Sequence, residues 1–183
     1  FTDKLVPPTW IGAMARYQTR EVDGNGVLVK VTTIPKGTRS QSWMGPTNLH
    51  DYTIQADVKG STKNGKMPDV GLINQRYTLD LMGSSQQLQI RSWNPQLEAR
   101  FAKTVPFAWK PDVWYTIKSQ SENKDGKAII RGKVWPKGEK EPEAWTTEAA
   151  DETPNTTGSP GLFGNASDAE IFSDNEKVTP NAG

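Results

Sequence analysis

Apolar and polar residues alternate along much of this chain, whereas runs with helical spacing are scarce. Every second residue of Tyr52–Val58 is apolar, and polar residues such as Gln55 and Asp57 stand between them. A period of two is typical of a β-strand with one buried face. The pattern predicts strands at Trp10–Tyr17, Gly26–Thr33, Gln41–Met44, Tyr52–Val58, Gly71–Met82, Gln87–Trp93, Arg100–Thr104, Trp114–Ser121, Lys127–Trp135, Trp145–Ala149, Gly161–Phe163 and Ala169–Val178.

Turn-forming residues separate these runs, as in Asp23–Gly26 and Lys124–Gly126. Many short strands in a chain of 183 residues fit a sandwich better than a small barrel. We therefore expect an all-β fold in which two antiparallel sheets pack face to face. The whole chain, residues 1–183, is expected to form one domain. Within it, residues 1–9 would be an extended arm and residues 179–183 a tail.

Composition narrows the class of partner. The seven tryptophans argue against a disordered chain, although only 34% of the residues are hydrophobic. The 22 basic and 21 acidic side chains nearly balance, so no long-range field attracts nucleic acid. No apolar stretch is long enough to span a membrane. Cysteine is absent, which excludes disulfides and thiol chemistry.

The stretch Asn74–Trp93 predicts a sheet face made of long polar side chains. Leu79 and Leu81 fall on one side of this stretch, and Thr78 and Asp80 fall on the other. The same parity, applied to the other strands, predicts one outward surface. Its candidate ligand-binding residues are Trp43, Gln55, Asn74, Arg76, Gln87, Gln89, Arg91, Trp93, Lys118, Arg131 and Trp135.

This composition is typical of sugar recognition. Amides and guanidinium groups form hydrogen bonds with hydroxyls, and indole rings stack on the apolar face of a pyranose. In this hypothesis Trp43, Trp93 and Trp135 would stack on sugars, while Arg76 and Arg91 would donate paired hydrogen bonds. Two alternatives remain open: a protein interface, where tryptophan and arginine are also enriched, and an ordinary solvated face.

Catalytic patterns are missing from the sequence. His50 is the only histidine, and no Gly-x-Ser-x-Gly nucleophile motif accompanies it. Sandwich-fold glycanases often carry Glu-x-Asp-x-x-Glu on one strand, and no predicted strand of this chain has that motif. The sequence therefore favours a protein that binds without catalysing a reaction, and a glycoside-processing enzyme is kept as an alternative.

One metal site is a candidate. Asp3 lies near the start of the chain and Asp174 near its end, and sandwiches commonly bring their terminal strands together. Carboxylate oxygens at such a corner suit a structural Ca²⁺ ion. An arm at Phe1–Pro8, with its two prolines, also suggests strand exchange between copies of the chain.

Four segments carry a resemblance to a known module. They are PDVGLINQRYTLDLMGSSQQLQIRSW, VPFAWKPDVWYTIK, GKVWPKGEKEPEAWT and GSPGLFGNASDAEIFSDNEKVTPN. Together they resemble the concanavalin A-like, or laminin-G-like, jelly roll at the C-terminus of exported bacterial proteins with quinoprotein-like β-propeller repeats. More distantly they are similar to the sandwich domains of the 3-keto-glycoside hydrolase-like group. The likeness extends from about Asp23 to Asn181.

The resemblance implies a jelly-roll sandwich in an exported bacterial protein, periplasmic or extracellular. It implies carbohydrate binding on the concave sheet, or alternatively an interaction domain that packs against a propeller, another copy of itself or a surface assembly. No propeller blade is present in this sequence, so neither a quinone cofactor nor a dehydrogenase activity is carried over. The hydrolase-like relatives provide no catalytic residues that match positions in this chain.

Overall fold

The computed structural model describes residues 1, 5–14, 16–30, 39–94 and 98–182. All regular structure in these ranges is β-structure, which confirms the all-β expectation. The strands are β1 (Tyr17–Val22), β2 (Asn25–Lys30), β3 (Arg39–Trp43), β4 (Tyr52–Gly60), β5 (Asp69–Asn74), β6 (Tyr77–Met82), β7 (Gln87–Trp93), β8 (Ala99–Pro106), β9 (Tyr115–Lys124), β10 (Lys127–Pro136), β11 (Thr147–Asp151), β12 (Gly161–Asn165) and β13 (Ile171–Pro180). Among the residues described, no helix has the length and apolar character needed to cross a membrane.

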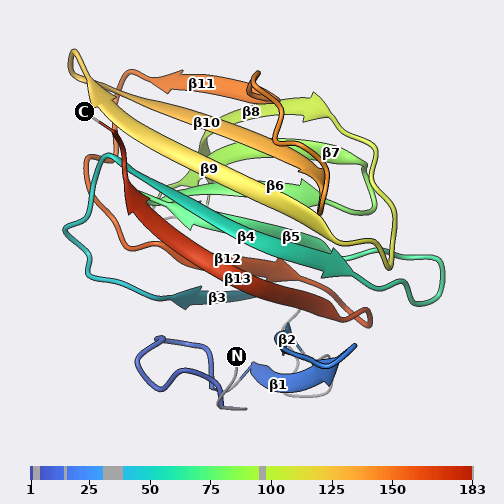
Figure 1. Ribbon diagram of the computed structural model, residues 1–183. Helices are drawn as coiled ribbons and strands as arrows, with labels where there is room; N and C mark the ends of the chain where they lie inside the picture. The colour runs from blue at the N-terminus through green and yellow to red at the C-terminus, as the bar shows by residue number, and fades with distance from the viewer. Residues whose placement is uncertain (2–4, 15, 31–38, 95–97, 183) are drawn as a thin grey trace.

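The strands form two antiparallel sheets that lie face to face (Figure 1). The seven-stranded sheet has the order β1-β2-β13-β4-β9-β10-β11, and the six-stranded sheet has the order β3-β12-β5-β6-β7-β8. Strands distant in sequence become neighbours: β12 lies between β3 and β5, and β13 lies between β2 and β4. The topology therefore depends on long-range pairing and not on hairpins alone.

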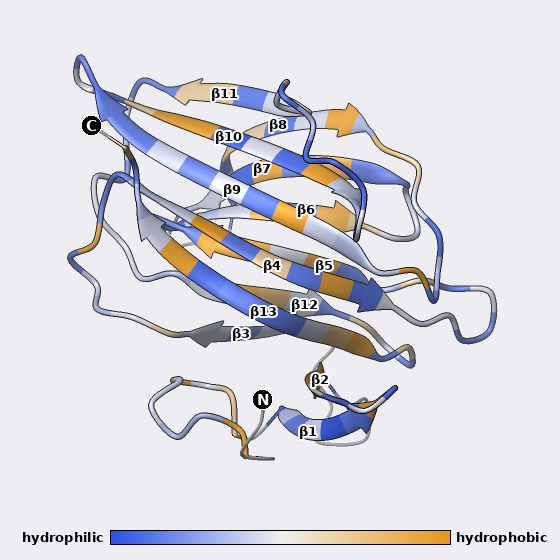
Figure 2. Cartoon of the chain, in the orientation of Figure 1, coloured by the Kyte–Doolittle hydropathy of each residue, from blue (hydrophilic) through white to orange (hydrophobic). Residues whose placement is uncertain are grey.

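The core lies between the sheets. Most strands contribute alternate side chains to it, and Figure 2 shows this alternation as bands along β4. Ile54 and Ile117 from the seven-stranded sheet are fully buried, as are Leu81 and Ile90 from the six-stranded sheet. Burying a side chain of this size stabilises the fold by about 1.5–3 kcal/mol.

One predicted strand is two strands. Gly71–Met82 is interrupted at Gln75 and Arg76, which have φ angles of 52° and 63° and form a two-residue hairpin turn between β5 and β6. Such turns usually contain Asn or Gly, and neither residue occurs at these two positions, so the sequence carried no turn signal. As a result, the even-numbered residues of β5 lie on the same face of the sheet as the odd-numbered residues of β6. Asn74 therefore aligns with Tyr77 and lies between the sheets.

The N-terminal region also departs from the predicted pattern. Most of the predicted strand Trp10–Tyr17 forms turns, and the first strand, β1, begins where that prediction ended. Gly12 has a φ angle of 83°, which interrupts an extended run. Phe1, like Val6 and Trp10, packs against the core. The predicted arm at 1–9 is described only in part, because residues 2–4 lie outside the described residues.

Candidate functional site

A hollow of about 510 Å³ lies on the outer face of the six-stranded sheet. This volume is within the range of about 300–1,000 Å³ typical of small-molecule sites. The residues that line the hollow are Arg16, Arg39, Ser40, Gln41, Trp43, Arg91, Trp93 and Phe163. They come from the turn region before β1 and from β3, β12 and β7, so the hollow crosses the sheet from one edge towards the other.

Two glycines lie beside lining residues of the hollow. Gly161 of β12 pairs with Trp43 on one side and with Ile73 on the other. Gly71 of β5 pairs with Phe163. Both glycines occupy outward positions, because their cross-strand partners Trp43 and Phe163 line the hollow. An outward position without a side chain lowers the surface between the taller residues of β3 and β7.

Aromatic side chains form two walls and part of the floor. Trp43 ends β3 and Trp93 ends β7, while Phe163 of β12 lies between these strands and is 5% exposed. Trp93 is 37% exposed, which is unusual for an indole ring. The pairing of β7 with β8 shifts by a bulge between Ser92 and Trp93, and bulges commonly redirect a side chain next to a functional site.

Arg91 connects the floor to a wall. Its guanidinium lies 4.8 Å from the ring centre of Phe163 and 5.6 Å from that of Trp93. The Nη1 atom donates hydrogen bonds to Asp80 at 2.5 Å and to the Gln89 side chain at 3.2 Å. Arg91 is 6% exposed and Asp80 only 1%. This buried pair holds the guanidinium plane against the aromatic rings.

The Asp80–Arg91 pair is incompletely satisfied. Asp80 Oδ1 and Arg91 Nε are buried and have no hydrogen-bond partner among the residues described. Burial raises the pKa of Asp80 to about 7, and the adjacent guanidinium of Arg91 acts in the opposite direction. A buried pair of this kind contributes little net stability, but removing one partner is costly. We interpret the pair as a device that fixes the position of Arg91.

Two more arginines stand at the rim. Arg16 Nη1 donates a hydrogen bond to the backbone oxygen of Arg39 at 3.0 Å. The guanidinium of Arg39 lies 5.6 Å from the ring centre of Trp93, although β3 and β7 are separated by three strands. The side chains of the two strands therefore meet across the hollow. Arg39 is exposed, so it can leave the Trp93 ring at a cost of about 0.5–1 kcal/mol.

Five of the predicted site residues lie on this outer face. Their cross-strand partners place all of them on the same side of the sheet. Three of them line the hollow, namely Trp43, Arg91 and Trp93. Gln89 supports Arg91 and donates a hydrogen bond to Thr104 at 3.0 Å, while Gln87 lies further along β7.

Four predicted residues lie on the opposite side of the molecule, so the prediction of a single surface is wrong. Gln55, Lys118, Arg131 and Trp135 point outward from the seven-stranded sheet. Alternation distinguishes inside from outside, but a sandwich has two outer faces, and parity does not say which face a strand contributes to. Residues 137–145 also cover part of this face: Lys118 pairs with Glu141 at 2.6 Å, and Trp135 is only 8% exposed.

The last two predicted residues, Asn74 and Arg76, lie on neither outer face of the sandwich. Asn74 is 0% exposed and donates hydrogen bonds to the backbone oxygens of Tyr52 and Ser119, at 3.1 and 3.0 Å. Its expected outward orientation is therefore wrong, because of the hairpin turn at Gln75. Arg76 is exposed in that turn, and its Nε donates a hydrogen bond to Thr157 O at 3.1 Å.

The predicted site residues did not include five residues of the hollow, namely Arg16, Arg39, Ser40, Gln41 and Phe163. Arg39 and Phe163 were not selected although both lie in or beside predicted strands, and the alternation of β12 alone would have placed Phe163 on the same face as Gly161. Arg16 lies in a region of turns, and no sequence pattern indicates that it reaches the hollow.

The calcium prediction finds no support in the residues described. They contain no group of three or more His, Cys, Asp or Glu side chains that could hold a metal. Asp174 accepts a hydrogen bond from Asn25 at 2.6 Å, and Asp3 lies outside the described residues. His50 is exposed and shares a hydrogen bond of 2.6 Å with the adjacent Asp51.

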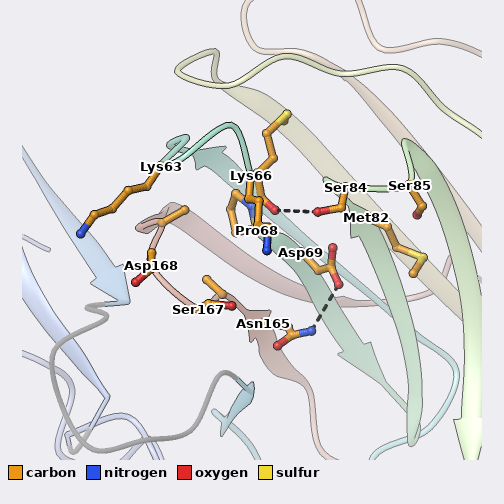
Figure 3. Close-up of a pocket in the computed structure, with 13 residues that line it drawn as sticks. Lys63, Lys66, Pro68, Asp69, Met82, Ser84, Ser85, Asn165, Ser167 and Asp168 are labelled. Atoms are coloured by element: carbon orange, nitrogen blue, oxygen red, sulfur yellow. Dashed lines mark hydrogen bonds between the residues drawn. The ribbon is translucent and has the colours of Figure 1, made fainter.

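A second, smaller cavity of about 240 Å³ lies at one end of the sandwich, where the loops after β4, β6 and β12 meet (Figure 3). Asp69 connects two of these segments, because it accepts hydrogen bonds from the Gly83 backbone at 3.0 Å and from Asn165 at 3.4 Å. Lys63, Lys66 and Asp168 are exposed at its rim. No buried side-chain atom without a partner faces it among the residues described. Its polar groups thus have mainly structural roles.

Comparisons with known proteins identify the fold. The sequence matches no family model and no curated protein, whereas 575 chains of solved structures match. The carbohydrate recognition domain of Emp47p superimposes with a TM-score of 0.59 at 11% identity, covering 97% of this chain and 91% of that one. Lectin UEA-II, solved in complex with galactose, gives 0.57 at 12% identity, with 98% and 97% covered. A glycosyl hydrolase family protein from Mycobacterium fortuitum gives 0.50 at 18% identity, with 96% and 87% covered.

At these identities the likeness shows the fold, which is a concanavalin A-like jelly roll of two antiparallel sheets. This confirms the fold class expected from the sequence. Lectins and a glycosyl hydrolase family protein share the fold, so the fold alone does not decide between binding and catalysis. The resemblance to the module of propeller proteins stays a prediction.

Proposed function

We propose that this chain is a non-catalytic carbohydrate-binding module that holds a glycan in the hollow of the six-stranded sheet. The observation that carries the proposal is the pair of tryptophans, Trp43 and Trp93, on the two sides of a hollow that also presents Arg91 and Gln41. Indole rings stack on sugar rings, and amide and guanidinium groups form hydrogen bonds with hydroxyls. Among proteins with this fold, one is a carbohydrate recognition domain and another was solved with galactose.

The fixed position of Arg91 supports selective binding. Asp80 and Phe163 hold its guanidinium in place before any ligand arrives. A group that is already ordered loses little conformational entropy on binding, so each hydrogen bond contributes more to the affinity. The two hydrogen bonds of Arg91 described above, to Asp80 and Gln89, both use its Nη1 atom, so neither uses Nη2. Arg91 itself lines the hollow.

The same proposal states that the module does not hydrolyse the glycan it binds. Hydrolysis by two carboxyl groups needs a pair about 5–10 Å apart. The outward positions of β6 carry Thr78, Asp80 and Met82, and the nearby Asp69 of β5 is engaged by hydrogen bonds from Gly83 and Asn165. Asp80 is buried and paired with Arg91. We further propose, on the sequence resemblance alone, that the module belongs to an exported bacterial protein.

The test is retention on immobilised polysaccharides in affinity gel electrophoresis. We expect Trp93→Ala to reduce the affinity by at least about tenfold, because stacking on an indole ring contributes on the order of 1–3 kcal/mol. Trp145→Ala is the matched control, since Trp145 lies beside Lys133 of β10, on the other sheet. Retention that survives Trp93→Ala unchanged would contradict the proposal, as would no retention on any polysaccharide.

A protein interface is the second candidate, and a separate observation favours it. Ile11 and Met14 are 71% and 70% exposed, and Ile11 pairs through its backbone with Trp43 at the edge of the hollow. Exposed apolar side chains next to tryptophan and arginine are typical of interfaces. If this candidate is right, light scattering shows a defined assembly that Ile11→Ser with Met14→Ser dissociates. A monomer that binds glycan would exclude it.

A further inference from the structure

The charges of the hollow are all of one sign. Three of its eight lining residues are arginines, Arg16, Arg39 and Arg91, and none is an aspartate or glutamate. This contrasts with the whole chain, in which 22 basic and 21 acidic side chains nearly balance. The positive charge of the hollow is therefore a local feature.

Little negative charge compensates these arginines. Among the residues described, no carboxylate lies within the 4.0 Å ion-pair distance of Arg16 or Arg39. Asp80 forms its ion pair with Arg91, and burial raises the pKa of Asp80 to about 7, while the charge of Arg39 acts on it only weakly in the opposite direction. Among the residues described, Arg16 and Arg39 at the rim thus have no ion-pair partner.

The neighbourhood of the rim supports this reading. Lys30 is buried, and its pKa is lowered by burial and, secondarily, by the charge of Arg16. Several other arginines of the fold have partners of opposite charge: Arg20 pairs with Glu170 at 2.7 Å, and Arg100 pairs with Asp151 at 2.7 Å. Arg16 and Arg39 differ from these arginines, and both line the aromatic hollow.

We propose that the hollow binds an anionic glycan, that is, a polysaccharide whose sugar rings carry carboxylate or sulfate groups. This inference rests on the proposed function. In it, Trp43 and Trp93 contact the apolar faces of the rings, and Arg16 and Arg39 bind the anionic substituents. Guanidinium groups match both anions, because their planar N–H groups donate two parallel hydrogen bonds to a carboxylate or sulfate.

The experiment compares charged and neutral forms of the same backbone. The protein is applied to polygalacturonate and its methyl-esterified form, and to dextran sulfate and dextran, at low and high salt. We expect one charged form to be retained at least about tenfold more strongly than its neutral counterpart, and the preference to weaken with salt. Stronger retention on polygalacturonate would identify a carboxylate as the anion, and stronger retention on dextran sulfate would identify a sulfate.

Substitutions of single arginines test which residues cause the preference for the charged glycan. Arg39→Gln and Arg16→Gln should each remove most of the preference for the charged form. Arg131→Gln is the control and should leave the preference unchanged, because Arg131 points outward from the seven-stranded sheet and pairs with Glu122 and Glu148. Circular dichroism of each variant confirms that the fold is intact.

Each outcome is decisive. Equal retention on charged and neutral forms, lost in Trp93→Ala, would overturn the anionic inference and leave the proposed function standing. No retention on any glycan would overturn both. Polyglutamate, a polyanion without sugar rings, serves as a further arm: retention equal to that of the acidic glycan would show an unspecific anion surface and contradict the inference.

Discussion

Arg91 shows how single residues set the character of the candidate site. The side chain is long and charged, yet it is 6% exposed, because Phe163 stacks against it and Asp80 accepts its hydrogen bond. A free surface arginine loses rotamer entropy when it binds a ligand, and Arg91 has already lost it on folding. The strength of any hydrogen bond from Arg91 to a ligand therefore depends on residues that the ligand does not touch.

Asn74 is a polar residue with a structural role. It bridges β4 and β9 from the end of β5, since its amide donates to the backbones of Tyr52 and Ser119 and its Oδ1 accepts a hydrogen bond of 2.6 Å from Ser121. It holds the two sheets together at one end of the sandwich.

Asn74→Leu should therefore lower the free energy of unfolding by about 2–4 kcal/mol, because buried polar partners lose their hydrogen bonds. Urea denaturation followed by tryptophan fluorescence measures this loss. Asn48→Leu, at an exposed position, is the control and should change stability by less than about 0.5 kcal/mol. Glycan affinity of the folded variant should stay unchanged; a stable Asn74→Leu variant with lost affinity would place Asn74 in the site instead.

At the scale of elements, alternation in the sequence predicts most strands but cannot assign them to sheets. Tyr52–Val58 and Gln87–Trp93 fall inside β4 and β7, and both strands place the predicted side chains outward or inward as expected. The sheet to which each belongs depends on partners far along the chain: β12 joins β3 to β5, and β13 joins β2 to β4. A local pattern carries no information about such pairings.

The same limit explains why the predicted site residues are divided between the two sheets. Trp43, Arg91 and Trp93 were predicted and line one hollow, whereas Arg131 and Trp135 have the same parity but belong to the other sheet. Composition identified the kind of residue that recognises sugars. Only the strand order shows which of these residues can touch one ligand.

At the scale of the whole molecule, buried carboxyl groups make stability depend on pH. Burial raises the pKa of Glu176 in β13 to about 7 from an ordinary value of 4.5, although Ser173 donates a hydrogen bond to it, which acts in the opposite direction. The folded state then binds more protons than the unfolded state between pH 4.5 and about 7. The contribution of Glu176 to the free energy of unfolding therefore falls as pH rises through this window. The raised pKa of Asp80 acts in the same direction.

Glu176→Gln should flatten this dependence, since glutamine keeps the shape of the protonated side chain and does not ionise. We expect the variant to be more stable than the wild type above pH 7, by up to about 3 kcal/mol, and nearly equal to it at pH 4. Denaturation curves at pH 4, 6 and 8 check this, with the exposed Glu143→Gln as control. Parallel pH profiles for the wild type and Glu176→Gln would contradict the assignment.

The two outer faces of the sandwich differ in a way that bears on function. Residues 137–145 lie over part of the seven-stranded sheet, where Lys133 donates a hydrogen bond to Pro142 O at 2.8 Å and lies 4.6 Å from the Trp145 ring. The six-stranded sheet instead carries the hollow of about 510 Å³ with Trp43 and Trp93. Our account therefore assigns ligand binding to the six-stranded face alone.

The most direct test follows the indole N–H signals of the seven tryptophans by NMR while an oligosaccharide is added. The first probe is tetragalacturonate, followed by an oligosaccharide of whichever polysaccharide retains the protein. Our account predicts that the signals of Trp43 and Trp93 shift in a saturable manner, while those of Trp135 and Trp145 on the other sheet do not. Saturable shifts confined to Trp135 and Trp145, with Trp43 and Trp93 unmoved, would contradict it.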